Sequence, residues 1–483
     1  MPKFKTYGQN QSYLLPPSLS DCLPKDHVCF AISNIVDGLD LNPIEKTYSV
    51  QGASAYPPSA LVKVLFLAYI HGIRSSRKIE AKLYQDIAFR FLSGNITPDH
   101  GTINLFRKNH LTNLKEIFAQ IIVLADDMGM VNLADISLDG TKIKANAGKD
   151  STVNLKQIDD YKKYFEKAME EANEIDKEED KKYGSGRGYG AMPDHLIDPK
   201  ARQAALESAK KKLAKLKEAE RQIKAKQELA KNKEDKKLKK NTTSNLTDPD
   251  ASLMKMKDDS FKVGYNIQVT SSRQFIAAYD LNNDSTDSRN LPDMVRETEN
   301  NTKTKIKTLK ADAGYFSKSN IEFLDGKNID SYIPTQKNNG NAAFKYNQVK
   351  DEFICSQGKR LVFKRIDHNA KQYWGTECGS CPRLADCTKM KRKSLNYDFE
   401  LVKRSEEMEQ KLKTETGKAK FKERKTEIEP VFGDIKQNQG FTAFLCRGKA
   451  AALAELGLVC VAHNLVKIFR YLQTKPAMAG MAN

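Results

Sequence analysis

The sequence has no long uncharged apolar run. Its longest apolar stretches, residues 60–70 and 450–462, are interrupted by Lys63 and Glu455. Neither approaches the roughly 18 to 20 residues that cross a bilayer. The first 20 residues also lack the apolar stretch of about 7 to 15 residues that a secretory signal needs. These absences exclude a membrane protein and predict a cytoplasmic location.

Cysteine is scarce as well, with eight in 483 residues. That is too few for a disulfide scaffold, and a reducing compartment would keep them as thiols. Four of them nevertheless cluster: Cys355, Cys378, Cys381 and Cys387. A CxxC pair with two further cysteines could furnish a tetrahedral thiolate site for structural Zn²⁺. The alternative is a set of free, buried thiols.

Positive charge is abundant. The chain carries 80 Lys and Arg against 62 Asp and Glu, a formal net charge of +18. Hydrophobic residues make up 39%, which at this length is enough for more than one core, so wholesale disorder is excluded. The charge favours a polyanionic partner, with nucleic acid ahead of an anionic membrane. A charged surface that serves only solubility is the alternative.

The first part of the chain, residues 1–130, has helical periodicity. It predicts helices over residues 58–73, 77–92 and 102–128, the second capped by Ser76. Short helices joined by a tight connection and followed by basic residues are typical of a helix-turn-helix DNA reader. An ordinary helical bundle with a basic face fits the same pattern.

The next part alternates strands and helices. Strands are predicted over residues 135–143, 262–270, 274–281, 305–311 and 329–333. Helices are predicted over residues 287–301 and 317–324. This order predicts an α/β fold with a mixed sheet. Its core would comprise residues 131–149, 250–335 and 414–473.

Two insertions interrupt that core. In the first, residues 150–249, a rough heptad of leucines and isoleucine predicts a charged helical arm of two helices linked by the glycine-rich residues 183–192. The heptad positions are Leu206, Leu213, Leu216 and Ile223. Residues 201–240 carry 15 Lys and Arg against 6 Asp and Glu, so the arm is either a clamp on DNA phosphates or a solvated hairpin. The second insertion, residues 336–413, contains the cysteine cluster.

Two acidic residues stand where an α/β sheet collects its ligands, at strand ends. Asp139 lies in the first strand between apolar neighbours, where a charge is costly unless it binds something. Asp312 ends the strand of residues 305–311 and is followed by Gly314, which permits a sharp exit. Phosphodiester chemistry commonly uses paired divalent cations held by carboxylates from separate elements, and both positions fit that use.

A third acid is suggested by residues 420–441. Lys422, Lys425, Glu429 and Lys436 are spaced 3, 4 and 7 apart, which places them within roughly 60° of helix arc. A basic stripe beside one acid could hold a metal ion and the phosphates around it, or be a solvated helix face. Pro430 predicts a kink there, or a helix that restarts in its first turn.

These residues carry a resemblance to a known family. The motifs YPPSALVKVLFLAYIHGIRSSRKIE, PDHGTINLFRKNH, SLDGTKIKANA, DDSFKVGYNIQV, LKADAGYFS, IEPVFGDIKQNQGF and RGKAAALAELGLVCVAHNLVKI resemble the DDE transposases of bacterial insertion sequences. Within that family the chain is most similar to the group in which an RNase H-like catalytic domain follows a helical N-terminal domain.

The resemblance implies a catalytic, metal-binding triad of Asp139, Asp312 and Glu429, using Mg²⁺ or Mn²⁺. The family signature around the last acid contains Tyr, Arg, Glu and Lys. Here Glu429 and Lys436 match, while Lys425 stands in place of the Arg and Lys422 in place of the Tyr.

The resemblance also implies partners: terminal inverted repeats and target DNA, a homodimer that holds two ends in a synaptic complex, and association with the nucleoid. The DNA-binding candidates are Lys422, Lys425 and Lys436 with four residues of the first domain, Arg74, Arg77, Arg107 and Lys108. Two alternatives to an active transposase remain open. One is a DNA-binding regulator or decayed copy without catalysis, and the other is a metal-dependent nuclease without strand transfer.

Overall fold

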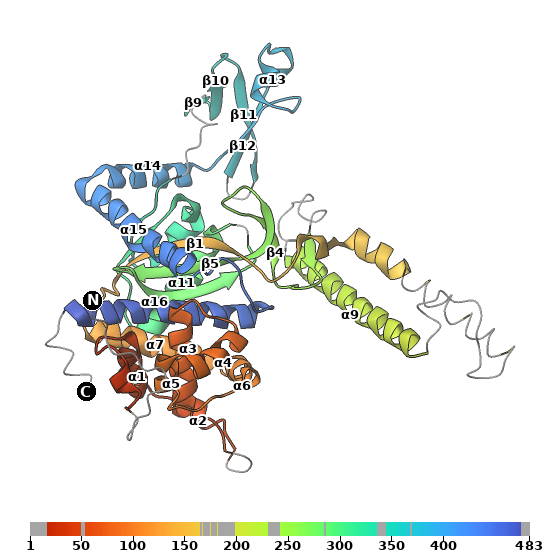
Figure 1. Cartoon of the computed structure of the whole chain (residues 1–483). Coiled ribbons are helices and arrows are strands. Elements are labelled where there is room, and N and C mark those ends of the chain that lie inside the picture. Colours follow the sequence, from red (N-terminus) through yellow and green to blue (C-terminus); the bar gives the residue numbers. More distant parts are fainter. Residues whose placement is uncertain are drawn as a thin grey trace, which may run out of the picture.

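The structure is a computed structural model that describes residues 17–49, 54–164, 167, 174, 181, 199–229, 242–284, 286–335, 344–367 and 370–474. A group of N-terminal helices lies against a central mixed sheet, and two insertions project from that sheet in different directions (Figure 1).

The N-terminal part is helical, as predicted, but with more breaks. Its elements are η1 (Ser20–Cys22), α1 (Val28–Asp37), α2 (Asn42–Glu45), α3 (Pro58–Ile70), α4 (Ser76–Gln85), α5 (Ile87–Leu92), α6 (His100–Asn109) and α7 (Leu111–Asp127). The predicted helix over 77–92 is interrupted at Asp86, which is extended and whose carboxylate accepts a hydrogen bond from the Ala88 N–H at 3.0 Å. This N-cap starts a new helix where periodicity alone indicated one continuous element.

The central sheet is mixed, so the predicted α/β class is confirmed. Its strands are β1 (Asp135–Lys144), β4 (Ser252–Lys255), β5 (Phe261–Ser272), β6 (Phe275–Asn282), β7 (Thr308–Ala311) and β8 (Asp330–Tyr332). They are ordered β4-β5-β1-β7-β8, and β6 also pairs with β5. The pairs β4–β5, β5–β6 and β1–β5 are antiparallel, whereas β1–β7 and β7–β8 are parallel.

Helices cover both faces of this sheet. One face packs its apolar side chains, including Ile136 and Leu138 of β1, against α11 (Leu291–Thr302) and α12 (Lys318–Gly326). The other face contacts α15 (Glu415–Gly433), and α16 (Lys449–Thr474) packs on β6. Because side chains alternate along a strand, Asp135, Ser137 and Asp139 of β1 point toward α15.

The helix α16 joins the N-terminal helices to the sheet. It packs against α3 and α7 as well as β6, and one continuous apolar core includes residues from all of these elements. Within the described residues it is the helix long and apolar enough to cross a membrane, yet 72% of that apolar window is buried inside the protein. This burial is that of a core helix.

The first insertion leaves and rejoins the sheet through a short antiparallel pair, β2 (Thr152–Asn154) and β3 (Thr243–Asn245). Residues 155–164 are helical, and α9 (Pro199–Leu229) forms the long helix of the arm (Figure 1). Leu216 and Ile223 of the predicted heptad are buried at the base of the arm with Val153 and Ile158. The side chain of Leu206 and the predicted link over residues 183–192 lie outside the described residues.

The second insertion is a separate antiparallel sheet, which the sequence analysis did not predict. Its order is β13-β12-β11-β10-β9, from β9 (Phe344–Asn347), β10 (Glu352–Cys355), β11 (Arg360–Asp367), β12 (Ala370–Gly375) and β13 (Ser394–Tyr397). The short elements η6 (Cys378–Ser380) and α13 (Leu384–Cys387) lie between β12 and β13, and α14 (Phe399–Lys413) leads back to α15. In Figure 1 this sheet projects away from the central one, with α13 at its tip.

Candidate active site

Asp139 and Asp312 lie side by side at the parallel pair of the central sheet. The register that pairs Leu138 of β1 with Ala311 of β7 brings the next residue of each strand together. Asp139 still belongs to β1, whereas Asp312 follows β7 and caps η5 (Ala313–Tyr315) by accepting a hydrogen bond from the Gly314 N–H at 2.7 Å.

The environment of Asp139 disfavours negative charge. Burial is the main reason why its pKa is raised to about 6, and the carboxylates of Asp312 and Asp287 raise it further. The Gly140 N–H, which donates to Asp139 at 2.8 Å, and the Arg424 guanidinium act in the opposite direction. Because the effects that raise its pKa outweigh those that lower it, a cation beside Asp139 would strongly stabilise its ionised form.

Glu429 reaches the same region from α15. The guanidinium of Arg424 lies between the two predicted acids: its Nη1 is 3.3 Å from Asp139 Oδ2, and its Nη2 is 3.9 Å from Glu429 Oε1. The Arg424 side chain is 9% exposed, whereas that of Glu429 is 57% exposed. Asp139 and Asp312 thus adjoin at the ends of two neighbouring strands, and Arg424 lies between Asp139 and Glu429.

A buried ion cluster holds α15 on the sheet. Lys310 of β7 has no exposed surface, and its Nζ lies 2.7 Å from Glu427 Oε2, 2.9 Å from Asp135 Oδ1 and 3.4 Å from Glu423 Oε2. The hydroxyl of Ser137 also donates to Glu427 at 2.5 Å. Glu427, two residues before the predicted catalytic acid, is therefore a structural partner of Lys310.

Pro430 does not restart the helix, because α15 continues through it to Gly433. The carbonyl of Thr426, which the missing Pro430 N–H leaves without a helical partner, accepts a hydrogen bond from the side-chain amide of Gln274 at 3.0 Å. A π-helical turn, η7 (Asp434–Asn438), then follows, a feature frequent at functional sites.

The basic residues of the signature lie in two environments. Lys422 and Lys425 are exposed on the same side of α15 as Glu429, as the predicted stripe required. Lys436, in η7, donates to the Thr141 hydroxyl of β1 at 2.5 Å. Burial, followed by the nearby Lys257, lowers the pKa of Lys436, so an anion beside it would be favourable.

Asp287 is a further acid at the site that sequence reasoning missed. It precedes η4 (Ser288–Asn290) and α11, and its Oδ1 accepts hydrogen bonds from the side-chain amides of Asn266 at 2.6 Å and Gln268 at 2.8 Å. A methyl group on Gly140 would fall 2.7 Å from that oxygen, so only glycine lets Asp287 approach β1 this closely. The sequence signal that could have pointed to Asp287 is the pair of amide side chains, Asn266 and Gln268, within one predicted strand.

Two of the four predicted DNA-binding residues in the N-terminal part are occupied internally. Arg74 Nη1 pairs with the buried Glu455 of α16 at 2.9 Å and donates to the Ala443 carbonyl at 2.7 Å. Arg107 donates to the Arg74 carbonyl at 2.7 Å. These contacts favour a structural role for both arginines over the predicted DNA contact, because their donors are already used. Arg77 and Lys108 are exposed.

The four clustered cysteines lie together in the second insertion, away from the acids. Together they line one cavity of about 300 Å³. Within the part of the chain that the structure describes, no group of three or more His, Cys, Asp or Glu side chains already converges as metal ligands, here or at the acids.

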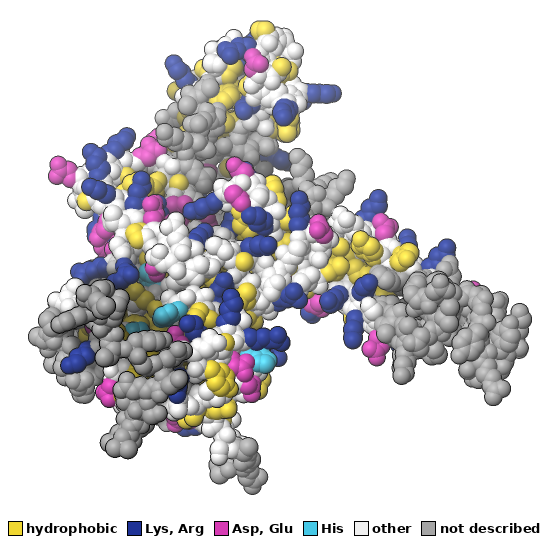
Figure 2. Space-filling view, in the orientation of Figure 1, with side chains coloured by type: hydrophobic (Ala, Val, Ile, Leu, Met, Phe, Trp, Pro, Cys, Tyr) yellow, Lys and Arg dark blue, Asp and Glu magenta, His cyan; other side chains and the backbone are white. Residues whose placement is uncertain are grey.

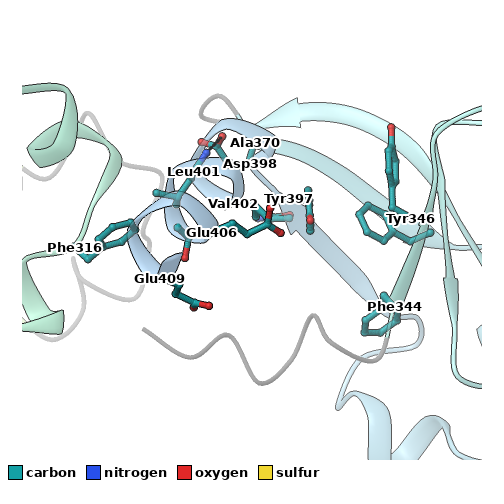
Figure 3. Close-up of a pocket in the computed structure, with 13 residues that line it drawn as sticks. Phe316, Phe344, Tyr346, Ala370, Tyr397, Asp398, Leu401, Val402, Glu406 and Glu409 are labelled. Carbon is teal, nitrogen blue, oxygen red and sulfur yellow. Dashed lines mark hydrogen bonds between the residues drawn. The ribbon is translucent and has the colours of Figure 1, made fainter. Parts of the chain in front are cut away.

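A larger cavity, of about 670 Å³, lies between α14 and the insertion sheet (Figure 3). Phe344 and Tyr346 line it from the sheet, while α14 contributes Glu406 and Glu409, and Phe316 lines it from the segment after η5. The carboxylates of Glu406 and Glu409 would repel DNA phosphates, so we do not assign this cavity to the candidate active site.

Basic side chains are spread widely over the surface. On the molecular face in Figure 2, Lys and Arg side chains cover parts of the sheet, the arm and the insertion, with acidic residues between them.

Two parts of the chain match models of known protein families. Residues 354–469 match a family model described as "Transposase DDE domain", and residues 17–109 match one described as "Transposase domain (DUF772)". Searches of curated proteins and of solved structures gave no match. The first match contains Glu429 and Lys436, whereas Asp139 and Asp312 lie outside both. A DDE transposase domain implies an RNase H-like core, with which the mixed sheet agrees. The two matches support a DDE transposase of an insertion-sequence family.

Proposed function

We propose that this transposase binds the terminal inverted repeats of its element, cleaves the DNA at their ends and transfers the 3′ ends to target DNA. The observation that carries the proposal is that Asp139 stands beside Asp312 at the end of the parallel β1–β7 pair, while the Arg424 guanidinium reaches from Asp139 toward Glu429 of α15. Such an arrangement serves phosphoryl chemistry, in which a protein mainly positions groups and balances charge.

The acids fit a divalent cation. Their donors are carboxylate oxygens, the ligands that Mg²⁺ and Mn²⁺ prefer. The raised pKa of Asp139 reports a place where added positive charge is favourable. When bound, paired Mg²⁺ or Mn²⁺ ions would activate the attacking oxygen and stabilise the leaving oxygen.

Arg424 has a second part in this proposal. Its buried Nε has no hydrogen-bond partner among the described residues. The guanidinium supplies positive charge between Asp139 and Glu429, and a cation bound by those acids would compete with it. Released from them, Arg424 could pair with a phosphate, because its planar fork matches phosphate oxygens.

Asp287 acts as a positioning residue in the same proposal. Two amide donors fix its carboxylate over Gly140, beside the backbone that carries Asp139. From there it adds negative charge to the site and lies in close approach to the β1 backbone at Gly140. An acid that is already held in place needs less free energy to be arranged around a metal ion.

DNA would be held by basic residues around this centre. Lys436 is proposed to contact a phosphate of the transposon end, with Lys422 and Lys425 along α15 and Arg77 and Lys108 on the N-terminal helices. A homodimer is proposed because transposition joins two ends, and the complex would be associated with the nucleoid.

The test uses the purified full chain, Mg²⁺ and DNA carrying the inverted repeats found beside its gene. We expect end-specific nicks and joined products. Asp312→Ala and Glu429→Gln should bind this DNA but not cut it. Glu407→Gln on the exposed side of α14 is the matched control and should keep wild-type activity.

Each alternative has its own outcome. Wild-type protein that binds the ends but never nicks them would support a regulator. Nicking without joined products would support a nuclease. Nicking by Asp312→Ala at the wild-type rate would overturn the assignment of the acids.

A further inference from the structure

The tip of the second insertion gathers four of the eight cysteines around one cavity. Cys355 ends β10, Cys378 begins η6, Cys381 follows η6 and Cys387 ends α13. Although 22 residues separate Cys355 from Cys378, all four cysteines line the same cavity of about 300 Å³. All four are free thiols.

Tight backbone turns present these cysteines. The Cys355 N–H donates to the Lys359 carbonyl at 2.9 Å, around a turn in which Gly358 adopts the left-handed φ of +71°. The Cys381 N–H donates to the Cys378 carbonyl at 3.1 Å. Short turns of this kind are the usual way in which small zinc sites bring their ligands together.

The backbone also makes room for a sulfur. A methyl group on Gly375 of β12 would fall 2.2 Å from the Sγ of Cys378, so the sulfur lies directly against this glycine. A larger residue there would push Cys378 away from its present position. Gly375 therefore fixes where one of the four thiols stands.

The tip of the second insertion has too little hydrophobic core to explain its folded conformation. The apolar cluster of the insertion consists of Phe353, Leu361, Tyr373 and Leu395, all in strands. In residues 376–393, which are all described, Cys378 is the one buried apolar side chain. A small unit with so little core generally needs disulfides or a metal ion.

The charges around the cavity suit bound thiolates. Lys359, Arg383 and Lys393 line it together with the cysteines. Four thiolates around Zn²⁺ carry two net negative charges, which these cations would offset.

We propose that Cys355, Cys378, Cys381 and Cys387 bind one Zn²⁺ ion that stabilises the tip of the second insertion. Binding exchanges the four thiol protons for four zinc–sulfur bonds, so four protons leave for each ion bound. In the part of the chain that the structure describes, the four sulfurs do not converge as metal ligands. Zinc binding therefore requires them to move inward from the cavity wall.

The test measures metal directly, without DNA. Full-length protein purified under reducing conditions without a metal-binding tag should contain about one zinc per chain by mass spectrometry. Cys381→Ser should lose most of this zinc. Cys22→Ser, which removes an exposed cysteine far along the chain, should keep it. Asp139→Asn should also keep the zinc, which separates this site from the proposed catalytic one.

A second measurement applies even if Cys381→Ser fails to fold. Treating wild-type protein with a mercurial should release the zinc as about four thiols react, and Co²⁺ in its place should show the absorption of tetrahedral thiolate coordination. Protein without bound zinc that also fails to take up Co²⁺, or disulfides among the four cysteines in the reduced preparation, would overturn the proposal.

Discussion

Replacing Asp139 by Asn should stabilise the protein while removing its chemistry. The fold raises the pKa of Asp139 from 3.8 to about 6, mainly through burial. Each pKa unit corresponds to about 1.4 kcal/mol, so ionised Asp139 costs the folded state about 2 to 3 kcal/mol. Asn has nearly the same shape, can still accept the Gly140 N–H and carries no charge. Its folded state should therefore escape this cost.

The pH dependence gives the sign of the effect. A carboxyl group whose pKa is raised by folding is disfavoured only when it is ionised. Well below pH 3.8, Asp139 is protonated in folded and unfolded chains alike, and the two proteins should be equally stable. As the pH rises from 3.8 to about 6, the unfolded chain ionises while folded Asp139 keeps its proton, so wild-type protein should lose stability relative to Asp139→Asn. The full difference should be present at pH 8.

Urea unfolding at pH 8 and at pH 4.5, without divalent cations, measures this difference, which should be clearly smaller at pH 4.5 than at pH 8. The matched control is Glu429→Gln, whose exposed side chain should change the free energy of unfolding by less than about 0.5 kcal/mol at either pH. Adding Mg²⁺ should stabilise wild-type protein more than Asp139→Asn. An Asp139→Asn protein that is less stable than wild type at pH 8, or a gain that is the same at both pH values, would refute the reasoning.

The other predictions separate neighbouring residues with different roles. Glu427→Gln should lower the free energy of unfolding by about 3 to 5 kcal/mol in urea titrations, because it leaves the buried Lys310 without its closest partner. Arg424→Gln should tighten Mn²⁺ binding about tenfold, because it removes a positive charge whose competition with the ion costs about 1.4 kcal/mol of binding free energy. Electron paramagnetic resonance measures this affinity, and an unchanged value would contradict the prediction. Asp287→Asn should reduce Mn²⁺ affinity and slow end cleavage at least tenfold with little change in the unfolding midpoint, and wild-type values for both would exclude its positioning role. Arg74→Met should lower stability by a few kcal/mol, since Glu455 then stays buried without its cation, while the ratio of end to random DNA binding in a filter assay should not change.

The sequence was informative where local pattern and chemistry coincide. Asp139 and Asp312 were predicted as site residues because each stands at a predicted strand where a charged side chain needs a partner. Glu429 was predicted from helical spacing and from the family signature. In each case the evidence lay within about ten residues, and the structure brings the three segments to one edge of the sheet.

Sequence reasoning failed where the deciding partner is distant. Arg74 looked like a DNA contact because its charge was visible, whereas its partner Glu455 lies 381 positions later. Asp287 was overlooked because it stands in a connecting segment, and its donors Asn266 and Gln268 are ordinary polar residues until the strands pair. The break at Asp86 also escaped periodicity, since an N-cap depends on one residue rather than on a repeat.

The position of α16 has a consequence for shortened copies of the element. A stop codon anywhere before Lys449 would remove the helix on which both the N-terminal helices and the sheet are assembled. Such a product would expose two apolar surfaces at once and would be degraded or aggregate. This gene should therefore not yield a free-standing repressor by simple truncation, and inhibitory variants should arise instead by point substitution of the acids in a full-length chain.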